Sequence, residues 1–208
     1  MKKTFILLLL LVLTFNFSSC KSEKKTDNKE VVKEAKKTAF PFSLKNAKNE
    51  INFTAYKTSD KVPVGGQFKK VNIISGGEGN TIKEAINNTE FSIPVSSIFT
   101  KDTSRDYKIK KFFFGIMDNT KLLSGKLVIE NDSVGYTHIK MNGVTEKVAF
   151  KYSIEANTFS MKATMDVTNW NAIDALNSLN TVCKDLHKGA DGVSKTWSDV
   201  ALNITSTF

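Results

Sequence analysis

The side chains that could carry out chemistry in this sequence are few and lie far apart. The two histidines are His138 and His187, and neither has a cysteine, histidine or carboxylate at the spacing of a metal site. His138 lies within a strand pattern, and His187 follows a helical pattern, where a cation would suit the helix dipole. We expect both histidines to be structural and no metal to be bound.

Other catalytic signatures are also missing. The sequence has no Gly-x-Ser-x-Gly, no phosphate-binding loop and no dinucleotide fingerprint. Cys183 lies on an apolar helical stripe and is expected to be an inert, buried thiol. Arg105, the only arginine, lies beside Asp106 and close to Asp102, which fits either a structural ion pair or a contact to the polar head group of a ligand. We therefore expect no enzymatic activity and no cofactor.

The N-terminus carries the most specific local signal. Met1-Lys2-Lys3 is followed by an apolar run over residues 5–15, too short to remain in a bilayer as a spanning helix, and then by Phe17-Ser18-Ser19-Cys20. Two small residues before a cysteine resemble the lipobox of bacterial lipoproteins, in which signal peptidase II cuts and the new N-terminal cysteine is acylated. Residues 1–19 are thus expected to be a signal peptide, with a plain signal peptide as the alternative. The acylated Cys20 would anchor the protein to the outer membrane of the cell envelope, on its periplasmic or its surface side.

The rest of the chain divides into a tether and a single domain. Residues 20–40 are polar and of mixed charge, so they cannot bury enough surface to fold alone. Residues 41–208 form the expected domain.

The formal net charge of the 208-residue chain is +9, with basic residues spread along it apart from the cluster Lys108, Lys110 and Lys111. This charge indicates a solvated basic surface or a weak attraction to anionic lipid or polymer, and export makes nucleic acid an unlikely partner.

Two stretches of period-two alternation dominate the domain. Apolar side chains recur at every second position from Val144 to Ile154, where only Glu146 interrupts the row, and again from Phe159 to Val167, with mostly polar residues such as Lys and Thr between them. Because successive side chains of a strand point to opposite faces, each stretch predicts a strand with one dry and one wet face. The turn-prone Glu155-Ala156-Asn157 between them predicts an antiparallel hairpin.

Further strands and two helices are predicted around this hairpin. The predicted strands cover residues 51–57, 64–74, 91–96, 122–130, 135–141 and 199–208. Gly65 and Gly66 inside one of them predict a bulge or a sharp bend. Spacings of three and four predict helices over 102–117 and from Thr168 or Asn169 to Gly189. Many antiparallel strands without alternating helices favour an all-β domain, either a closed barrel or a sandwich.

Several segments together resemble the YceI-like family. They are Val95-Ser96-Ser97-Ile98-Phe99-Thr100 followed by Ser104-Arg105-Asp106 and Phe112-Phe113-Phe114, then Asn142-Gly143-Val144-Thr145, and Gly65-Gly66-Gln67-Phe68. Leu186-His187-Lys188-Gly189 and Lys195-Thr196-Trp197 look like the lipoprotein branch of that family in Bacteroidetes-type bacteria. The resemblance covers residues 42–208. The His-Ser pair that better-known members keep in the first strand is absent here, where Asn52-Phe53-Thr54-Ala55 stands instead.

The resemblance implies a lipocalin-like antiparallel barrel of about eight strands with two short helices, holding a long apolar lipid such as a polyisoprenoid or a quinone tail. On this reading the protein carries or stores the lipid. The candidate ligand-binding residues are Phe53, Phe68, Phe91, Ile93, Val95, Phe113, Phe114, Met117, Val148, Phe150, Tyr152, Met161, Met165 and Trp170.

Alternation identifies an inner face but not whether that face surrounds a cavity or a packed core. The alternative is a ligand-free barrel that acts as an interaction or stress-protective module. The expected partners are an apolar lipid and, through Cys20, the membrane, and assembly into a homodimer is left open.

Overall fold

The computed structural model describes residues 39–208, so the predicted signal peptide, Cys20 and most of the predicted tether lie outside the described residues. The strands are β1 (Phe42–Ser43), β2 (Lys48–Lys57), β3 (Val62–Phe68), β4 (Asn72–Ser75), β5 (Glu78–Gly79), β6 (Glu90–Pro94), β7 (Ile98–Phe99), β8 (Leu122–Ile129), β9 (Val134–Met141), β10 (Val144–Glu155), β11 (Thr158–Asp166) and β12 (Asp199–Thr207). The helices are α1 (Ile82–Ile86), α2 (Thr103–Lys108) and α3 (Ile173–Val182), with short 3-10 or π segments η1 (Val95–Ser97), η2 (Ile109–Phe113), η3 (Phe114–Ile116) and η4 (Val167–Trp170).

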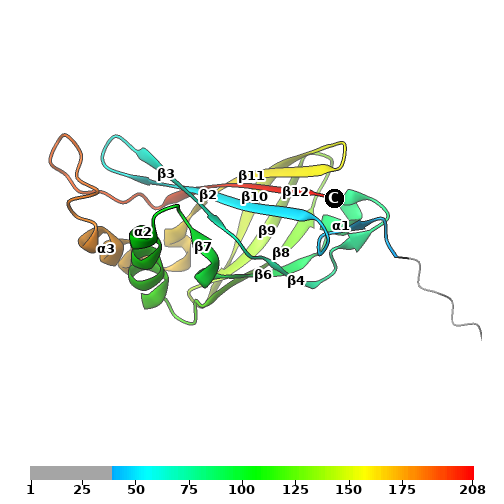
Figure 1. The fold of residues 1–208 in the computed structure, drawn as a ribbon, viewed down its shortest axis with the longest axis horizontal. Coiled ribbons are helices and arrows are strands. Elements are labelled where there is room, and N and C mark those ends of the chain that lie inside the picture. The colour runs from blue at the N-terminus through cyan, green and yellow to red at the C-terminus, as the bar shows by residue number, and fades with distance from the viewer. Residues whose placement is uncertain (1–38) are drawn as a thin grey trace, which may run out of the picture. The chain divides into compact units, whose positions relative to one another are not determined.

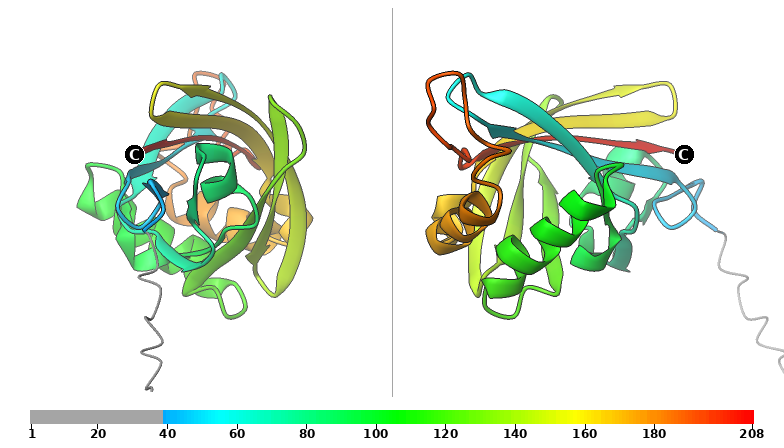
Figure 2. Two further views of the ribbon diagram at one scale, coloured as in Figure 1. Left: turned by 90° about the vertical axis from the view of Figure 1, so that its right-hand side faces the viewer. Right: turned by 60° about the vertical axis from the view of Figure 1, so that its left-hand side comes forward.

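One antiparallel sheet of ten strands makes up the body of the domain, in the order β4-β6-β8-β9-β10-β11-β12-β2-β3-β7. Strands β3 and β4 are halves of one kinked strand, and β6 and β7 are halves of another, interrupted by η1. Because β3 pairs with β7 and β4 with β6, these two kinked strands join the ends of the ladder. Counting each kinked strand once, eight strands curl into a barrel-like body (Figure 2), which confirms the predicted fold class.

The predicted hairpin is confirmed as β10 and β11. Its register places Tyr152 opposite Met161 and Ile154 opposite Phe159, so the dry rows of the two strands face the same side. Of the two alternatives predicted at Gly65 and Gly66, the bulge is wrong, because β2 and β3 pair without a register shift from Lys57↔Val62 to Ile51↔Phe68, and the bend stays a prediction.

The helices lie at the two ends of the barrel. In Figure 1, α1 lies at one end, near the C-terminus, and α2 and α3 lie together at the other. The predicted helix over 102–117 is confirmed in position, but it is made of α2, a π-helical η2 and a 3-10 turn. The second predicted helix is too long at both ends, since Asn171 adopts a left-handed conformation before α3 and α3 stops at Val182. No helix in the described part of the chain is long and apolar enough to cross a membrane.

Two separate clusters of buried apolar side chains form the core. One joins the helical segments α2–η3 and α3 to the barrel through Phe113, Phe114, Trp170 and Leu176. The other packs α1 on the barrel through Ile82, Ile86, Phe150 and Phe159. Both clusters lie within residues 42–208, so this part of the chain has the hydrophobic core with which a domain can fold as a unit.

Candidate functional site

A cavity of about 210 Å³ lies inside the barrel, and its wall includes members of both core clusters. Residues from β2, β12 and the η2 segment line it. On β12 the lining residues are Val200, Leu202, Ile204 and Ser206, which alternate along one face. The six steps from Val200 to Ser206 along an extended strand span roughly 20 Å, so the cavity follows most of the length of the barrel. The barrel is therefore packed towards both ends and hollow between them.

The wall is mostly apolar, and most of its polar side chains already have hydrogen-bond partners. Ser206 donates its hydroxyl to Asn49 Oδ1 at 2.6 Å, and Asn49 Nδ2 donates to the carbonyl of Leu44 at 2.7 Å. Thr89 Oγ1 donates to the carbonyl of Ala85 at 2.7 Å. Since these polar groups are satisfied by the protein, the cavity offers mainly van der Waals contact and suits a hydrocarbon better than a polar guest.

Eight of the fourteen candidate ligand-binding residues line this cavity. They are Phe53, Phe68, Phe91, Ile93, Phe113, Phe114, Met161 and Met165. They come from β2, β3, β6, the η2–η3 segment and β11, so the fold brings together residues that are distant in the sequence. Their contact with a ligand stays a prediction.

The other six candidates lie in packed regions and not on the cavity wall. They are Val95, Met117, Val148, Phe150, Tyr152 and Trp170, each at most 8% exposed. Three of them belong to β10, the strand with the clearest alternation, and no β10 residue lines the cavity. Alternation found the inner face of β10 correctly, but the side chains of α1 and of the loop before α3 fill the space in front of it.

Several wall residues were not among the candidates. Those contributed by the predicted strands include Ile51, Ala55, Leu123, Leu127, Ile139, Val200, Leu202 and Ile204, and α3 with the loop after it adds Leu176, Leu179, Thr196 and Trp197. The alternation of the strand over 199–208 was visible in the sequence and could have identified Val200, Leu202 and Ile204. Nothing in the sequence marks Trp197, because it lies in a loop without a periodic pattern.

Glycines opposite two wall phenylalanines explain how the rings lie along the wall. Phe53 is the cross-strand partner of Gly66, and Phe91 is the partner of Gly125. A Cβ at Gly66 would lie 2.3 Å from Phe53 Cζ, and one at Gly125 would lie 2.6 Å from Phe91 Cζ. Each ring therefore covers the glycine of the neighbouring strand, which keeps the ring against the sheet and away from the barrel axis.

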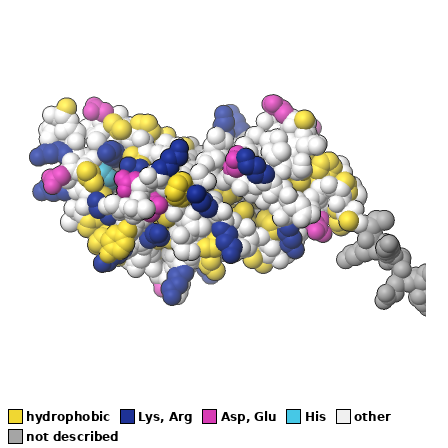
Figure 3. Space-filling model, in the orientation of Figure 1, with side chains coloured by type: hydrophobic (Ala, Val, Ile, Leu, Met, Phe, Trp, Pro, Cys, Tyr) yellow, Lys and Arg dark blue, Asp and Glu magenta, His cyan; other side chains and the backbone are white. Residues whose placement is uncertain are grey.

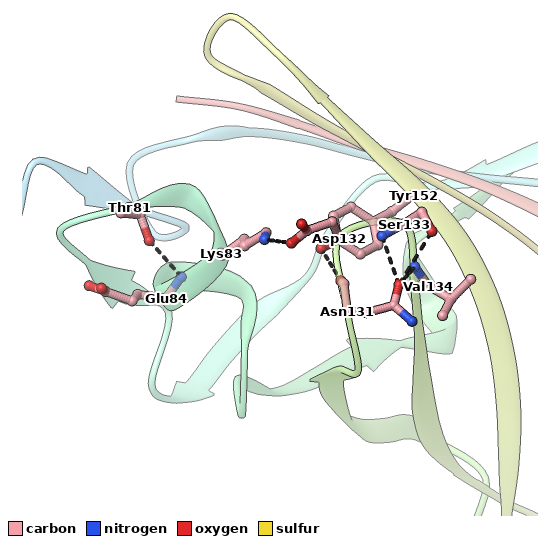
Figure 4. Close-up of polar contacts among 8 residues, drawn as sticks. All are labelled: Thr81, Lys83, Glu84, Asn131, Asp132, Ser133, Val134 and Tyr152. Atoms are coloured by element: carbon pink, nitrogen blue, oxygen red, sulfur yellow. Dashed lines mark hydrogen bonds and ion pairs between the residues drawn. The ribbon is translucent and has the colours of Figure 1, made fainter.

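The α1 end of the cavity is closed. Leu44 and Ile86 are almost fully buried there. Figure 4 shows how the neighbouring loop is held: Lys83 on α1 pairs with Asp132, and Tyr152 Oη donates to the carbonyl of Asn131 at 2.5 Å. Burial raises the pKa of Tyr152 above its usual range, so its hydroxyl remains a donor at neutral pH.

A neutral histidine lies near the other end of the cavity, after α3. His187 Nδ1 lies 2.7 Å from Thr196 Oγ1, and that hydroxyl donates to Asn180 Oδ1 at 2.9 Å, so Nδ1 must carry the proton. Burial, with smaller effects of the nearby cations Lys57, Lys108 and Arg105, lowers the pKa of His187 to about 4. The predicted structural role is kept, but the predicted benefit of a cation at a helix end is wrong, because α3 ends at Val182 and the ring is uncharged at neutral pH.

The remaining candidates for chemistry have structural surroundings. Arg105 Nη2 lies 3.6 Å from Asp102 Oδ2, and Arg105 Nη1 donates to the carbonyl of Thr100 at 3.4 Å. These contacts fit an ion pair that supports the start of α2. Burial raises the pKa of the Cys183 thiol, which disfavours the reactive thiolate. Within residues 39–208, no three His, Cys, Asp or Glu side chains gather closely enough to hold a metal ion.

Comparison with known proteins agrees with this architecture. Residues 42–208 match the model of the YceI-like domain. Two solved structures with the same fold are a polyisoprenoid binding domain from Saccharophagus degradans implicated in plant cell wall breakdown and BcnA from Burkholderia cenocepacia. The first has a TM-score of 0.54 and 9% identity, covering 76% of this chain and 93% of that one. The second has a TM-score of 0.52 and 13% identity, covering 80% of this chain and 99% of that one.

No curated protein matches the sequence. The two structural likenesses concern the fold, whereas the family match extends over the whole barrel from β1 to the C-terminus. The chain therefore belongs to the YceI-like domain family.

Proposed function

We propose that the domain binds a long-chain apolar lipid, such as a polyisoprenoid or the tail of a quinone, in the cavity of its barrel, and carries or stores it. The observation that supports this proposal most directly is the hollow between the two core clusters, because a barrel of this size with an ordinary core would be filled by side chains. The polyisoprenoid binding domain of similar fold is consistent with such a ligand.

The energetics favour a ligand that needs no polar contact inside the barrel. Each buried methylene contributes about 0.8 kcal/mol, so about ten of them give roughly 8 kcal/mol before the cost of ordering the chain. Before that cost is subtracted, this gain corresponds to a dissociation constant of about micromolar, which is the tightest binding that ten methylenes allow. A cavity of about 210 Å³ is suited to part of a long chain at a time, and Met161 and Met165 on its wall are flexible enough to follow a bent guest.

The proposal includes an envelope location. The lipobox-like Phe17-Ser18-Ser19-Cys20 supports acylation of Cys20 and attachment to the outer membrane. Metabolic labelling with palmitate, followed by fractionation of the membranes, tests this part. Label that persists in a Cys20→Ser variant would refute it.

We also propose that the protein is not an enzyme, since two potentially reactive groups of the described domain, His187 and Cys183, are held by burial as a neutral ring and an unreactive thiol.

Organic extraction tests the ligand directly. The protein is purified from membranes, extracted with chloroform and methanol, and the extract is analysed by mass spectrometry. A lipid with a long hydrocarbon chain in a near one-to-one ratio with protein is expected. Finding none, together with no uptake of an added polyprenol or quinone, would overturn the proposal.

A further inference from the structure

The helical segment that forms one wall of the cavity also has an unusual outer face. Ile109, Phe113 and Phe114, in η2 and at the start of η3, line the cavity. On the same segment, Tyr107 is 54% exposed and Ile116 is 50% exposed. A single turn of helix thus separates the apolar interior from an apolar exterior.

Basic side chains surround these exposed apolar groups. Residues 101–116 contain five basic residues, Lys101, Arg105, Lys108, Lys110 and Lys111, against two acidic ones. Asp106 is buried and accepts from the amide and hydroxyl of Thr100 at 2.8 and 2.7 Å, and Asp102 lies beside Arg105. Among the described residues, none of the four lysines forms an ion pair. Their charges are therefore available to a partner.

The aromatic and basic groups are arranged as one unit. The rings of Tyr107 and Phe112 meet edge to face with centroids 6.3 Å apart. Lys111 Nζ donates to Tyr107 Oη at 2.9 Å and lies 5.3 Å from the centroid of the Phe112 ring. Figure 3 shows hydrophobic side chains flanked by Lys and Arg over this end of the molecule. Aromatic rings with a polar edge beside lysines are typical of surfaces that lie in the head-group region of a bilayer.

We propose that this outer face of α2, η2 and η3, defined by Tyr107, Lys108, Lys111, Phe112 and Ile116, docks onto an anionic lipid bilayer. Charge complementarity selects an anionic surface, and each lysine near such a surface strengthens binding about fivefold. The exposed apolar side chains favour a bilayer over a soluble acidic polymer, because only the bilayer has an apolar region that can bury them.

The distribution of exposed apolar side chains agrees with this choice. Ten large hydrophobic side chains of the described residues are exposed, and seven of them come from residues 107–122 and 173–193. These two segments include η2 and α3, which pack against each other at the same end of the barrel. The apolar exposure is thus concentrated at one end, where a flat partner can cover it.

Docking in this way would hold the thin cavity wall against the bilayer, so a lipid could pass between membrane and cavity without crossing water. This consequence rests on the proposed function, whereas docking itself does not. The passage of lipid through this wall is consistent with the π-helical turn η2, since such turns interrupt the regular hydrogen bonding of a helix.

The test is co-sedimentation of residues 38–208, which lack Cys20, with lipid vesicles. We expect binding to vesicles of phosphatidylcholine and phosphatidylglycerol in equal parts, and little binding to phosphatidylcholine alone. The double variant Lys108→Glu/Lys111→Glu should weaken binding by about 25-fold or more, from two lysines at about fivefold each. Its matched control is Lys151→Glu/Lys162→Glu, the same charge change at two exposed, paired positions on the outside of β10 and β11.

A second pair of variants tests the apolar part. Ile116→Ser should weaken vesicle binding several-fold, whereas Val62→Ser, at another exposed apolar residue on β3, should not. Equal losses in test and control variants, equal binding to neutral vesicles, or equally tight binding to polyglutamate would each overturn the proposal. Organic extraction of the Lys108→Glu/Lys111→Glu variant separates the two proposals. If a variant that no longer docks still holds lipid, both proposals are supported. If the wild-type protein docks but holds no lipid, the proposed function alone is refuted.

Discussion

The substitution Ala55→Phe tests directly whether a ligand occupies the cavity. Ala55 continues the inward-facing row of β2 after Ile51 and Phe53, and it contributes only a methyl group to the cavity wall. Its neighbour Thr54 lies on the same strand but does not line the cavity. Thr54→Phe is therefore a matched control that adds a ring of similar size to the outside of the barrel.

The expected effect follows from the size of the cavity. An apolar cavity of about 150 Å³ is occupied by a single benzene molecule, so one phenyl ring would fill most of the 210 Å³ available here. If the ring displaces about four methylenes of the ligand, about 3 kcal/mol is lost. Affinity should therefore fall by about two orders of magnitude. Because the ring enters space that already exists, the ligand-free protein should not be destabilised, and filling part of the cavity should raise its stability.

Two measurements on the same samples decide the outcome. Calorimetric titration with a short isoprenoid alcohol gives the affinity, and thermal unfolding without ligand shows whether each variant is folded. We expect weak binding and, without ligand, an equal or higher melting temperature for Ala55→Phe, and normal binding for Thr54→Phe. A folded Ala55→Phe protein that binds like the wild type, or equal weakening by both variants, would show that the ligand binds elsewhere.

Three further predictions concern the walls and ends of the barrel. Gly66→Ala should cost about 1–3 kcal/mol in equilibrium denaturation because its Cβ would overlap the Phe53 ring, whereas Gly65→Ala, with no atom within 4 Å of its Cβ, should be nearly neutral. Trp170→Phe should cost about 1–3 kcal/mol, since Trp170 Nε1 donates at 2.8 Å to a buried carbonyl that would lose its partner. The pKa of His187 is about 4 in the folded protein and 6.5 when unfolded, so the stability that its neutral form gives is complete above pH 6.5 and is lost as the pH falls towards 4. Denaturation curves over that range should therefore be less pH-dependent in His187→Gln than in the wild type, and parallel curves for the two proteins would contradict the assigned pKa.

The sequence could predict the strands and the inner faces because both follow from a local period of two. The hairpin Val144–Val167 and the strand over 199–208 were predicted correctly for this reason. Helix ends were predicted less well, since the end of α3 at Val182 depends on how the following loop packs onto β2 through the pairing of Lys57 with Thr196. No pattern before α3 indicated the left-handed turn at Asn171.

The cavity itself could not be predicted, because it depends on side chains that never become neighbours in the sequence. Phe150 and Phe53 look equivalent as inward-facing aromatic residues of long strands. In the structure, Phe150 is 3% exposed within the cluster that holds α1, whereas Phe53 borders the hollow. The difference is decided by what the end-capping helices place in front of each ring, which is a property of the tertiary structure.

The hollow also has consequences for stability that a filled barrel would not have. An empty apolar cavity costs roughly 24 cal/mol for each Å³, so 210 Å³ corresponds to about 5 kcal/mol, a large part of the stability of a typical domain. Gly66 and Gly125 let two phenylalanine rings lie against the sheet, which leaves this space open. The free energy of unfolding should therefore rise when a ligand fills the cavity. Stabilisation by a ligand grows with its free concentration relative to its dissociation constant, so the melting temperature should rise steadily with added lipid. In Ala55→Phe the same rise should need about a hundredfold more lipid, because the new ring fills part of the cavity itself.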